Sequence, residues 1–464
     1  MKAQSLRWPR LVMLSVLLAL LLALLLVADW QAPPGGRVGP AVSTALTRPN
    51  ILLVLTDDQN TEAMRAMSYL PGRPYGAWIS FPNTFINTPT CCPSRATLLS
   101  GQYSSHHQVR DNSRGAAFND RSTVATWLDA AGYRTGLIGK YLNGYPYASQ
   151  PANYVPPGWD TWAAFSGGEK YYRYRLNVNG TLVSYGAAAQ DYSTDVLTNR
   201  ALTFIRDPSA QPFFLYLSYK APHAEFTPAP RHATAFSNTV MPHPPNFNEA
   251  DVSDKPAWVR SKARLNQDRI NAFDSDKRNA WRTLLAVDES IRRLLDALAA
   301  NGKLNNTVVV FMTDNGRLFG EHRLRDKTME YEEAVRTPFL VRYPGAANRT
   351  DQHLVANVDL ASTFADLADA APTRPQDGAS LVPLLEGQQP GWRTGVLLQW
   401  VGSSLVPAYN AIREPGWKYV ELATGERELY DLNADPYELQ NVAGRSAYAT
   451  QQQRLAEQLR RLLG

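Results

Sequence analysis

The feature that most constrains the fold of this chain is an apolar run that ends in two acidic residues. Residues 50–55 read Asn-Ile-Leu-Leu-Val-Leu, and Thr56, Asp57 and Asp58 follow directly. A strand with apolar residues on both of its faces is typical of a parallel sheet that helices cover on both sides. We therefore expect 50–55 to form a buried strand, with the two carboxylates at its carboxyl end.

Comparable apolar runs recur along the chain, and helical patterns lie between several of them. The clearest helical pattern covers 280–300, where aliphatic side chains recur at the spacing of one helix face. Strands that alternate with helices predict an α/β fold with a large, mainly parallel central sheet flanked by helices. The further runs lie at residues 136–139, 213–217, 308–312, 339–341 and 396–398.

The pattern changes twice in the second half of the chain. Residues 228–276 are rich in Pro, His, Asn and charge with little periodicity, so we expect a long insertion over one face of the fold. After about Trp392, short apolar runs predict a smaller antiparallel subdomain that ends in a helix at 450–463. The expected organisation is 1–30 as a signal peptide or signal anchor, 31–48 as a Pro/Gly-rich linker, 49–391 as the main domain and 392–464 as the C-terminal subdomain.

The N-terminus predicts export. Lys2, Arg7 and Arg10 precede an apolar stretch at 11–28, and such a positive flank stays inside while the rest of the chain is exported. The stretch is longer than a usual signal core of about 7–15 residues and only just reaches the roughly 17–25 that span a bilayer. A cleaved signal peptide and an uncleaved membrane anchor at 11–28 therefore both remain open. In either case we expect an extracellular or periplasmic protein, or one that is membrane-anchored and faces outward.

The charge pattern argues against one class of partner. The formal net charge is +5 at pH 7, but the sequence has no long run of Lys and Arg and no nucleic-acid motif. We therefore expect no nucleic acid partner.

Two acidic sets follow predicted strands. Asp57 and Asp58 end the first, while Asp314 and Asn315 end the strand predicted at 308–312. The carboxyl ends of parallel strands line one crevice, so the two sets can meet there. Carboxylate and amide oxygens suit Ca²⁺ or Mg²⁺ rather than zinc. The alternative is that each Asp only caps the next helix or turns the chain.

The only two cysteines of the chain, Cys91 and Cys92, are adjacent and cannot form an ordinary long-range structural disulfide. One interpretation is that Cys91 is an inert buried thiol. The other follows from its neighbours, because Pro93 and Arg95 lie two and four positions after Cys91. The run Cys91-Cys92-Pro93-Ser94-Arg95 resembles the signature of the type I sulfatases, a family of the alkaline-phosphatase superfamily.

The resemblance implies a reactive group that the genetic code does not encode. In this family the first Cys of the motif is oxidised after translation to formylglycine, whose hydrate is the nucleophile. A formylglycine-generating enzyme would modify Cys91 in the unfolded motif, and Arg95 would hold the hydrate. The resemblance also implies an alkaline-phosphatase-like fold, with 49–391 as the catalytic domain.

Three further positions match family motifs in the same order along the chain. The resemblance implies that Lys140, His223 and Lys327 contact the sulfate and that Lys327 also contacts the leaving oxygen. Taken singly, a lysine is more often an ordinary solvated side chain. The implied catalytic residues are Cys91, Arg95, Lys140, His223 and Lys327, and the implied ligands of Ca²⁺ or Mg²⁺ are Asp57, Asp58, Cys91, Asp314 and Asn315.

One departure from the family pattern concerns the base that decomposes the sulfated intermediate. Many sulfatases have Lys-x-His where this chain has Lys140-Tyr141-Leu142-Asn143, which looks more like N-acetylglucosamine-6-sulfatases and extracellular heparan endosulfatases. A histidine elsewhere could supply the imidazole, or these histidines could make ordinary surface contacts. The supporting candidates are His106, His107, His322 and Asn143.

The resemblance implies a sulfuric ester hydrolase that releases inorganic sulfate from a sulfated sugar or an aryl sulfate. Within the same superfamily, the alternative is a phosphonate monoesterase or phosphodiesterase. From a different class, the alternative is a non-catalytic relative that only binds sulfated glycans. The intact nucleophile motif and the complete metal set argue against this last interpretation.

Overall fold

The computed structural model of the protein describes residues 48–464. The apolar stretch at 11–28, predicted as a signal peptide or anchor, lies outside these residues. Within 48–464, no helix combines the length and the apolar character needed to cross a membrane.

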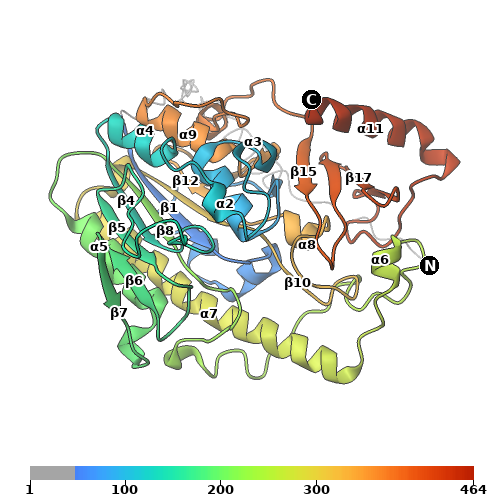
Figure 1. The fold of residues 1–464 in the computed structure, drawn as a ribbon, viewed down its shortest axis with the longest axis horizontal. Helices are drawn as coiled ribbons and strands as arrows, with labels where there is room; N and C mark the ends of the chain where they lie inside the picture. Colours follow the sequence, from blue (N-terminus) through green and yellow to red (C-terminus); the bar gives the residue numbers. More distant parts are fainter. Residues whose placement is uncertain (1–47) are drawn as a thin grey trace, which may run out of the picture. The chain divides into compact units, whose positions relative to one another are not determined.

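A ten-stranded mixed sheet forms the centre of the fold (Figure 1). Its middle is parallel, and β1 pairs with a parallel neighbour on each side over nearly its whole length. The parallel strands are, in spatial order, β9 (Thr307–Thr313), β1 (Asn50–Thr56), β8 (Phe213–Ser218), β4 (Arg134–Gly139) and β5 (Thr161–Phe165). Beyond β9 lie β12 (Phe339–Arg342), β2 (Trp78–Ser80) and β13 (Arg349–Thr350), and beyond β5 lie β6 (Arg175–Val178) and β7 (Thr181–Ser184). The prediction of an α/β fold with a mainly parallel sheet is confirmed.

Helices cover both faces of this sheet, which explains why β1 is apolar throughout. The helices are α2 (Cys91–Ser100), α4 (Val124–Ala130) and α9 (Asp359–Ala368) on one face, and α5 (Ser193–Arg206) and α7 (Gln267–Ala300) on the other. Ile51, Leu53 and Leu55 share a core with the first group, whereas Leu52 and Val54 share a core with the second. Each such fully buried aliphatic side chain contributes about 1.5–3 kcal/mol of burial free energy.

The C-terminal part forms a separate four-stranded antiparallel sheet, as predicted. Its strands are β15 (Val396–Trp400), β16 (Tyr409–Arg413), β17 (Trp417–Leu422) and β18 (Arg427–Asp431). One face packs on the main domain through residues such as Leu398 and Val420, and the other packs on α11 (Ala449–Leu463). The apolar run at 396–398 is therefore an edge strand of this small sheet and not part of the central one.

The predicted insertion at 228–276 is shorter than expected. Helix α7 begins at Gln267, so the last ten residues of the predicted insertion are helical, and the Asn266 side chain caps the helix by accepting from the Arg269 amide at 3.0 Å. The first turns of α7 are mostly exposed and polar, so no periodic apolar pattern in the sequence predicts them. The remainder holds only two short helices, η5 (Pro230–His232) and α6 (Ala257–Arg260).

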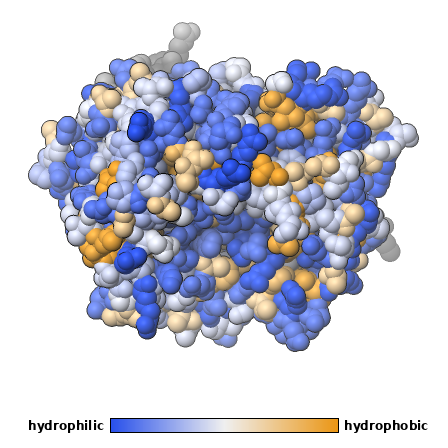
Figure 2. All heavy atoms as spheres, viewed as in Figure 1, coloured by the Kyte–Doolittle hydropathy of each residue, from blue (hydrophilic) through white to orange (hydrophobic). Residues whose placement is uncertain are grey.

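The other elements are short and mostly join or edge the main ones. On the face drawn in Figure 2, apolar residues are scattered among hydrophilic ones, as expected when the large apolar side chains fill the core. The short elements are η1 (Thr61–Ala66), η2 (Leu70–Gly72), β3 (Thr84–Phe85), α3 (Ser104–His107), η3 (Gly115–Ala117), η4 (Ala189–Asp191), η6 (Leu304–Asn306), β10 (Leu318–Phe319), β11 (Arg325–Asp326), α8 (Glu332–Val335), β14 (Val355–Ala356), α10 (Val382–Leu385) and η7 (Ser446–Tyr448).

Candidate active site

The two acidic sets meet at the carboxyl ends of β1 and β9. These strands are parallel neighbours, and their last residues, Thr56 and Thr313, are paired in register. The Asp58 amide donates to Asp314 Oδ1 at 3.1 Å, and Asn315 Nδ2 donates to Asp58 Oδ1 at 2.7 Å. Sheet topology thus joins residues that are 256 positions apart in the chain.

The two adjacent cysteines lie in different environments at the start of α2. Cys91 Sγ lies 3.2 Å from Asp57 Oδ1 and 3.8 Å from Asp58 Oδ1, whereas Cys92 is part of the apolar core beneath the helix. Both side chains are buried as free thiols. Of the two, only Cys91 points its sulfur at the acidic residues.

Arg95 lies one helical turn after Cys91 and ties α2 to the ends of several strands. It is fully buried, and its Nε donates to Asp314 Oδ2 at 2.7 Å. Its Nη1 donates to Ser218 Oγ at 2.6 Å and to the Lys140 carbonyl at 3.0 Å. Arg95 therefore fixes helix α2 against the ends of β9, β8 and β4.

Lys140 follows β4 and lies between two carboxylates. Its Nζ donates to Asp57 Oδ2 at 2.5 Å and lies 2.9 Å from Glu169 Oε1. The preceding Gly139 has a φ of 115°, and a Cβ there would lie 1.7 Å from the Ser218 carbonyl oxygen, so the close approach of β4 to β8 requires glycine. Glu169 is not among the site residues predicted from the sequence. The available signal was its position after the parallel strand β5, beyond Gly167 and Gly168.

Lys327 and His223 complete the surroundings of Cys91. Lys327 Nζ lies 2.7 Å from Cys91 Sγ and also donates to the Asp58 carboxylate. His223 Nε2 lies 3.6 Å from Asp58 Oδ2, while its Nδ1 lies 2.6 Å from the Ala224 carbonyl oxygen. A carbonyl only accepts, so Nδ1 carries the proton and Nε2 is unprotonated in the neutral ring.

A second buried arginine, Arg317, joins Arg95 at this site. Arg317 is not among the site residues predicted from the sequence. Arg317 Nη1 donates to Asp58 Oδ2 at 2.9 Å, and the side chain is only 4% exposed. The signal was its place directly after Asp314, Asn315 and Gly316. Arg317 gives Asp58 a cationic partner from the same loop that supplies the second acidic set.

These side chains form one polar cluster, and their charges shift one another's pKa values. The polar cluster consists of Asp57, Asp58, Cys91, Arg95, Lys140, Glu169, His223, Asp314, Asn315, Arg317 and Lys327. Burial alone would raise the pKa of Asp57, but Lys140, His223, Arg95 and Lys327 outweigh it and hold that pKa well below its usual value. The pKa of Asp58 is likewise lowered, since Lys327 and His223 outweigh its burial. Burial, together with Asp57, raises the pKa of the Cys91 thiol. Both aspartates are therefore ionised at neutral pH, and an unmodified Cys91 is a protonated thiol.

The polar cluster fits a divalent cation. Asp57, Asp58, Cys91 and His223 each offer one ligand atom, and these atoms lie within 4.8 Å of one another. Asn315 Oδ1 is buried and has no hydrogen-bond partner within residues 48–464. A buried amide oxygen beside two ionised carboxylates is the donor chemistry that Ca²⁺ and Mg²⁺ prefer.

Of the two alternatives for the three supporting histidines, the structure favours ordinary contacts away from Cys91. No hydrogen bond or ion pair within 48–464 joins His106, His107 or His322 to Cys91. His106 pairs with Asp377 at 2.6 Å and is more than half exposed.

Both ring nitrogens of His107 and of His322 are engaged in other contacts. His107 Nε2 lies 3.0 Å from Thr97 Oγ1, and its Nδ1 accepts from the Val109 amide. His322 Nδ1 lies 2.6 Å from Glu249 Oε2. Burial lowers the pKa of each ring to about 3, so both are neutral structural groups.

The side chain of the fourth supporting candidate, Asn143, makes no hydrogen bond to Cys91 within residues 48–464. Its Oδ1 is buried and has no hydrogen-bond partner in the part of the chain that the structure describes. The neighbouring Leu142, at the position of the family histidine, belongs to the apolar core and is 3% exposed.

Access to the cluster is set by its outer members. Cys91 is fully buried, while the side chains of His223, Glu169 and Lys327 are 28%, 20% and 10% exposed. These three mark the side open to solvent.

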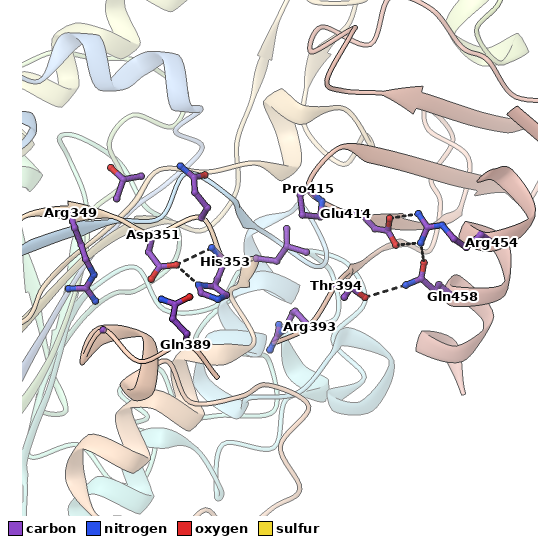
Figure 3. Close-up of a pocket in the computed structure, with 14 residues that line it drawn as sticks. Arg349, Asp351, His353, Gln389, Arg393, Thr394, Glu414, Pro415, Arg454 and Gln458 are labelled. Atoms are coloured by element: carbon purple, nitrogen blue, oxygen red, sulfur yellow. Dashed lines mark hydrogen bonds and ion pairs between the residues drawn. The ribbon is translucent and has the colours of Figure 1, made fainter. Parts of the chain in front are cut away.

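A separate cavity of about 800 Å³ lies between the main domain and the C-terminal sheet (Figure 3). It is lined by residues such as Arg349, Arg393 and Arg454, and none of the cluster residues lines it.

Known proteins resemble this chain over nearly its whole described length. Residues 49–370 match the family model described as Sulfatase, and residues 320–463 match the one described as N-sulphoglucosamine sulphohydrolase, C-terminal. N-acetylglucosamine-6-sulfatase of Homo sapiens is 34% identical, with 88% of this chain and 84% of that protein covered. N-acetylglucosamine-6-O-sulfatase of Bacteroides thetaiotaomicron is 31% identical, with 89% and 86% covered.

A solved structure shows the same relationship in three dimensions. It holds a protein in complex with its substrate D-glucosamine-2-N,6-O-disulfate and superposes with a TM-score of 0.79 at 29% identity. The superposition covers 89% of this chain and 97% of the other. Family match, relatives and fold agree, and the chain therefore belongs to the sulfatase family of sulfuric ester hydrolases.

Proposed function

We propose that this protein removes the 6-O-sulfate group of a glucosamine-type sugar, with formylglycine at position 91 and Ca²⁺ or Mg²⁺ in the polar cluster. Two relatives are named as N-acetylglucosamine-6-sulfatases, and the similar solved structure holds a 6-O-sulfated glucosamine. The observation that carries the chemistry is the position of Cys91, whose sulfur lies against two carboxylates and one ammonium group.

Two groups would supply the reactive chemistry at this site. Formylglycine at position 91 would provide a hydrated aldehyde as nucleophile, and a bound divalent cation would provide a Lewis acid for a sulfate oxygen. The ligands would be Asp57, Asp58, Asp314, Asn315 and residue 91.

In the proposed reaction, Lys140 and Lys327 hold positive charge, and His223 moves a proton. Burial would lower the pKa of Lys140 and of Lys327, but Asp57 raises the first and Asp58 raises the second above the usual value. Both ammonium groups therefore stay charged and neutralise sulfate oxygens in the transition state. Burial lowers the pKa of His223 despite the opposing effect of Asp58 and Asp57, so its neutral Nε2 is the group that can take up or return a proton.

Peptide mass spectrometry combined with a substrate panel tests this proposal. The protein is expressed with and without a formylglycine-generating enzyme, and the peptide that contains Cys91 is weighed in both samples. We expect sulfate release from 6-O-sulfated N-acetylglucosamine only in the sample with the aldehyde mass. An active protein that retains the thiol would contradict the formylglycine chemistry, and faster cleavage of an aryl phosphonate monoester or phosphodiester would favour the superfamily alternative.

We also propose that the protein is exported. This proposal rests on Lys2, Arg7 and Arg10, which precede the apolar stretch at 11–28. Cell fractionation of the full chain and of a variant that lacks residues 1–30 tests it. Equal recovery of both proteins from the cytosol would contradict export.

A further inference from the structure

Glu169 is a carboxylate at the mouth of the polar cluster that the chemistry above does not use. It lies in the loop between β5 and β6, after Gly167 and Gly168, both of which have positive φ angles. Its Oε1 lies 2.9 Å from Lys140 Nζ, and Lys140 is its only ion-pair partner within residues 48–464. Burial raises the pKa of Glu169, but the Lys140 charge outweighs this and lowers that pKa to about 2. The group is therefore an anion at any neutral pH.

An anion at this place repels a sulfate ester and so weakens its binding. Glu169 can therefore help the reaction only through another effect. Like charges that share a site repel each other, and screening is weak because the side chain is only 20% exposed. Within residues 48–464, Glu169 has no ion-pair partner except Lys140. Its effect must therefore be sought in Lys140.

Lys140 needs an anchor that the cation does not share. Its ammonium donates to Asp57 Oδ2 at 2.5 Å, and Asp57 is also a proposed metal ligand. A lysine side chain is a flexible stem with a point charge at its end, so an ammonium with Asp57 as its sole partner would be drawn toward the buried carboxylates. Glu169 lies on the solvent side and holds the same ammonium from there.

We propose that Glu169 is a positioning residue that holds the Lys140 ammonium at the mouth of the cluster, where it meets the sulfate group. The proposal rests on the proposed function, because it assigns sulfate binding to Lys140. Glu169 acts through Lys140 and does not contact the reacting atoms. Misplacement of a catalytic group by about 1 Å can cost roughly 100-fold in rate, which sets the size of the expected effect.

The first test compares single variants on a 6-O-sulfated N-acetylglucosamine substrate. We expect Glu169→Ala to lower kcat/KM by about 10-fold to 100-fold with an unchanged melting temperature and unchanged metal content. Glu169→Gln keeps an oxygen that can accept from the ammonium, so we expect a smaller loss. Lys170→Ala, the exposed neighbour in the same loop, is the matched control and should match the unchanged protein. Unchanged kcat/KM in Glu169→Ala would overturn the proposal.

A double-mutant cycle separates positioning from a direct or structural role. In a Lys140→Ala background we expect Glu169→Ala to change kcat/KM by less than about twofold, because the group that it positions is gone. The same loss in both backgrounds would show that Glu169 acts independently of Lys140 and would overturn the proposal. Failure of the proposed function is distinguishable, because then the unchanged protein with a confirmed aldehyde would release no sulfate at all.

Discussion

The ammonium group of Lys327 lies 2.7 Å from the sulfur of Cys91, across 236 positions of the chain. The same ammonium also donates to Asp58, so one side chain contacts both the proposed nucleophile position and a proposed metal ligand. This arrangement places a fixed positive charge where the sulfate ester must approach residue 91.

Lys327→Ala should therefore lower kcat far more than it lowers stability. We expect a loss of about 100-fold to 1,000-fold in kcat, the usual cost of removing one donor that stabilises developing negative charge. Lys262→Ala, a lysine in the segment after α6, serves as the control and should retain full activity. Steady-state kinetics on a sulfated sugar checks both, and a loss in Lys327→Ala below about threefold would contradict the assigned role.

The two cysteines offer an internal comparison. Cys91→Ala should abolish turnover, because it removes the position that becomes the nucleophile. Cys92→Ala should leave kcat within about twofold and lower the free energy of unfolding by about 1 kcal/mol, because Cys92 only fills the core beneath α2. Sulfate release and chemical denaturation measure the two effects. The opposite activity pattern would move the nucleophile to position 92.

Removal of the cation should abolish activity reversibly. We expect a chelator to stop sulfate release and added Ca²⁺ or Mg²⁺ to restore it. Asn315→Ala should raise the metal concentration needed for half-maximal activity by at least about 10-fold, because it removes a buried oxygen donor. Asn433→Ala, an exposed asparagine in the C-terminal subdomain, is the control. Full activity after exhaustive chelation, with metal analysis showing no bound ion, would exclude a metal-dependent reaction.

The raised pKa of Glu333, a residue outside the polar cluster, predicts that the free energy of unfolding depends on pH. Its Oε1 accepts from Asn246 Nδ2 at 2.8 Å, and burial together with Glu321 and Glu438 raises its pKa from 4.5 to about 8. Between about pH 4.5 and pH 8, Glu333 is therefore protonated in the folded state and ionised in the unfolded state. The stabilisation is complete below pH 4.5 and is lost as the pH rises through 8, with a slope near 1.4 kcal/mol per pH unit.

Urea unfolding at several pH values between 5 and 8 measures this slope. Glu333→Gln should make the measured slope less steep by about 1.4 kcal/mol per pH unit, because the amide does not titrate, while Glu457→Gln on α11 should leave the slope unchanged. The same slope in Glu333→Gln and in the unchanged protein would contradict the assignment of the proton to Glu333.

Local sequence patterns identify four of the five parallel strands of the core, whereas β5 at Thr161–Phe165 lies in none of the predicted runs. The run at 50–55 was recognised as a strand because both faces of β1 are covered, and 308–312 was recognised for the same reason. The first turns of α7 were missed because they are polar and exposed, so they carry no periodic apolar signal. Hydrophobic periodicity reports burial, and it is silent where a regular element is not buried.

The sequence by itself determined the motif that singles out Cys91 as the proposed nucleophile position, and the placement of the two acidic sets after their strands. Pro93 and Arg95 stand at the motif offsets only when they are counted from Cys91, and residues that follow adjacent parallel strands must share one sheet edge. Only the tertiary structure decided which further side chains converge there. Glu169 and Arg317 join the cluster, while His106, His107 and His322 are engaged elsewhere. The physical reason is that strand positions follow from local burial, whereas these contacts depend on how loops between distant strands direct their side chains.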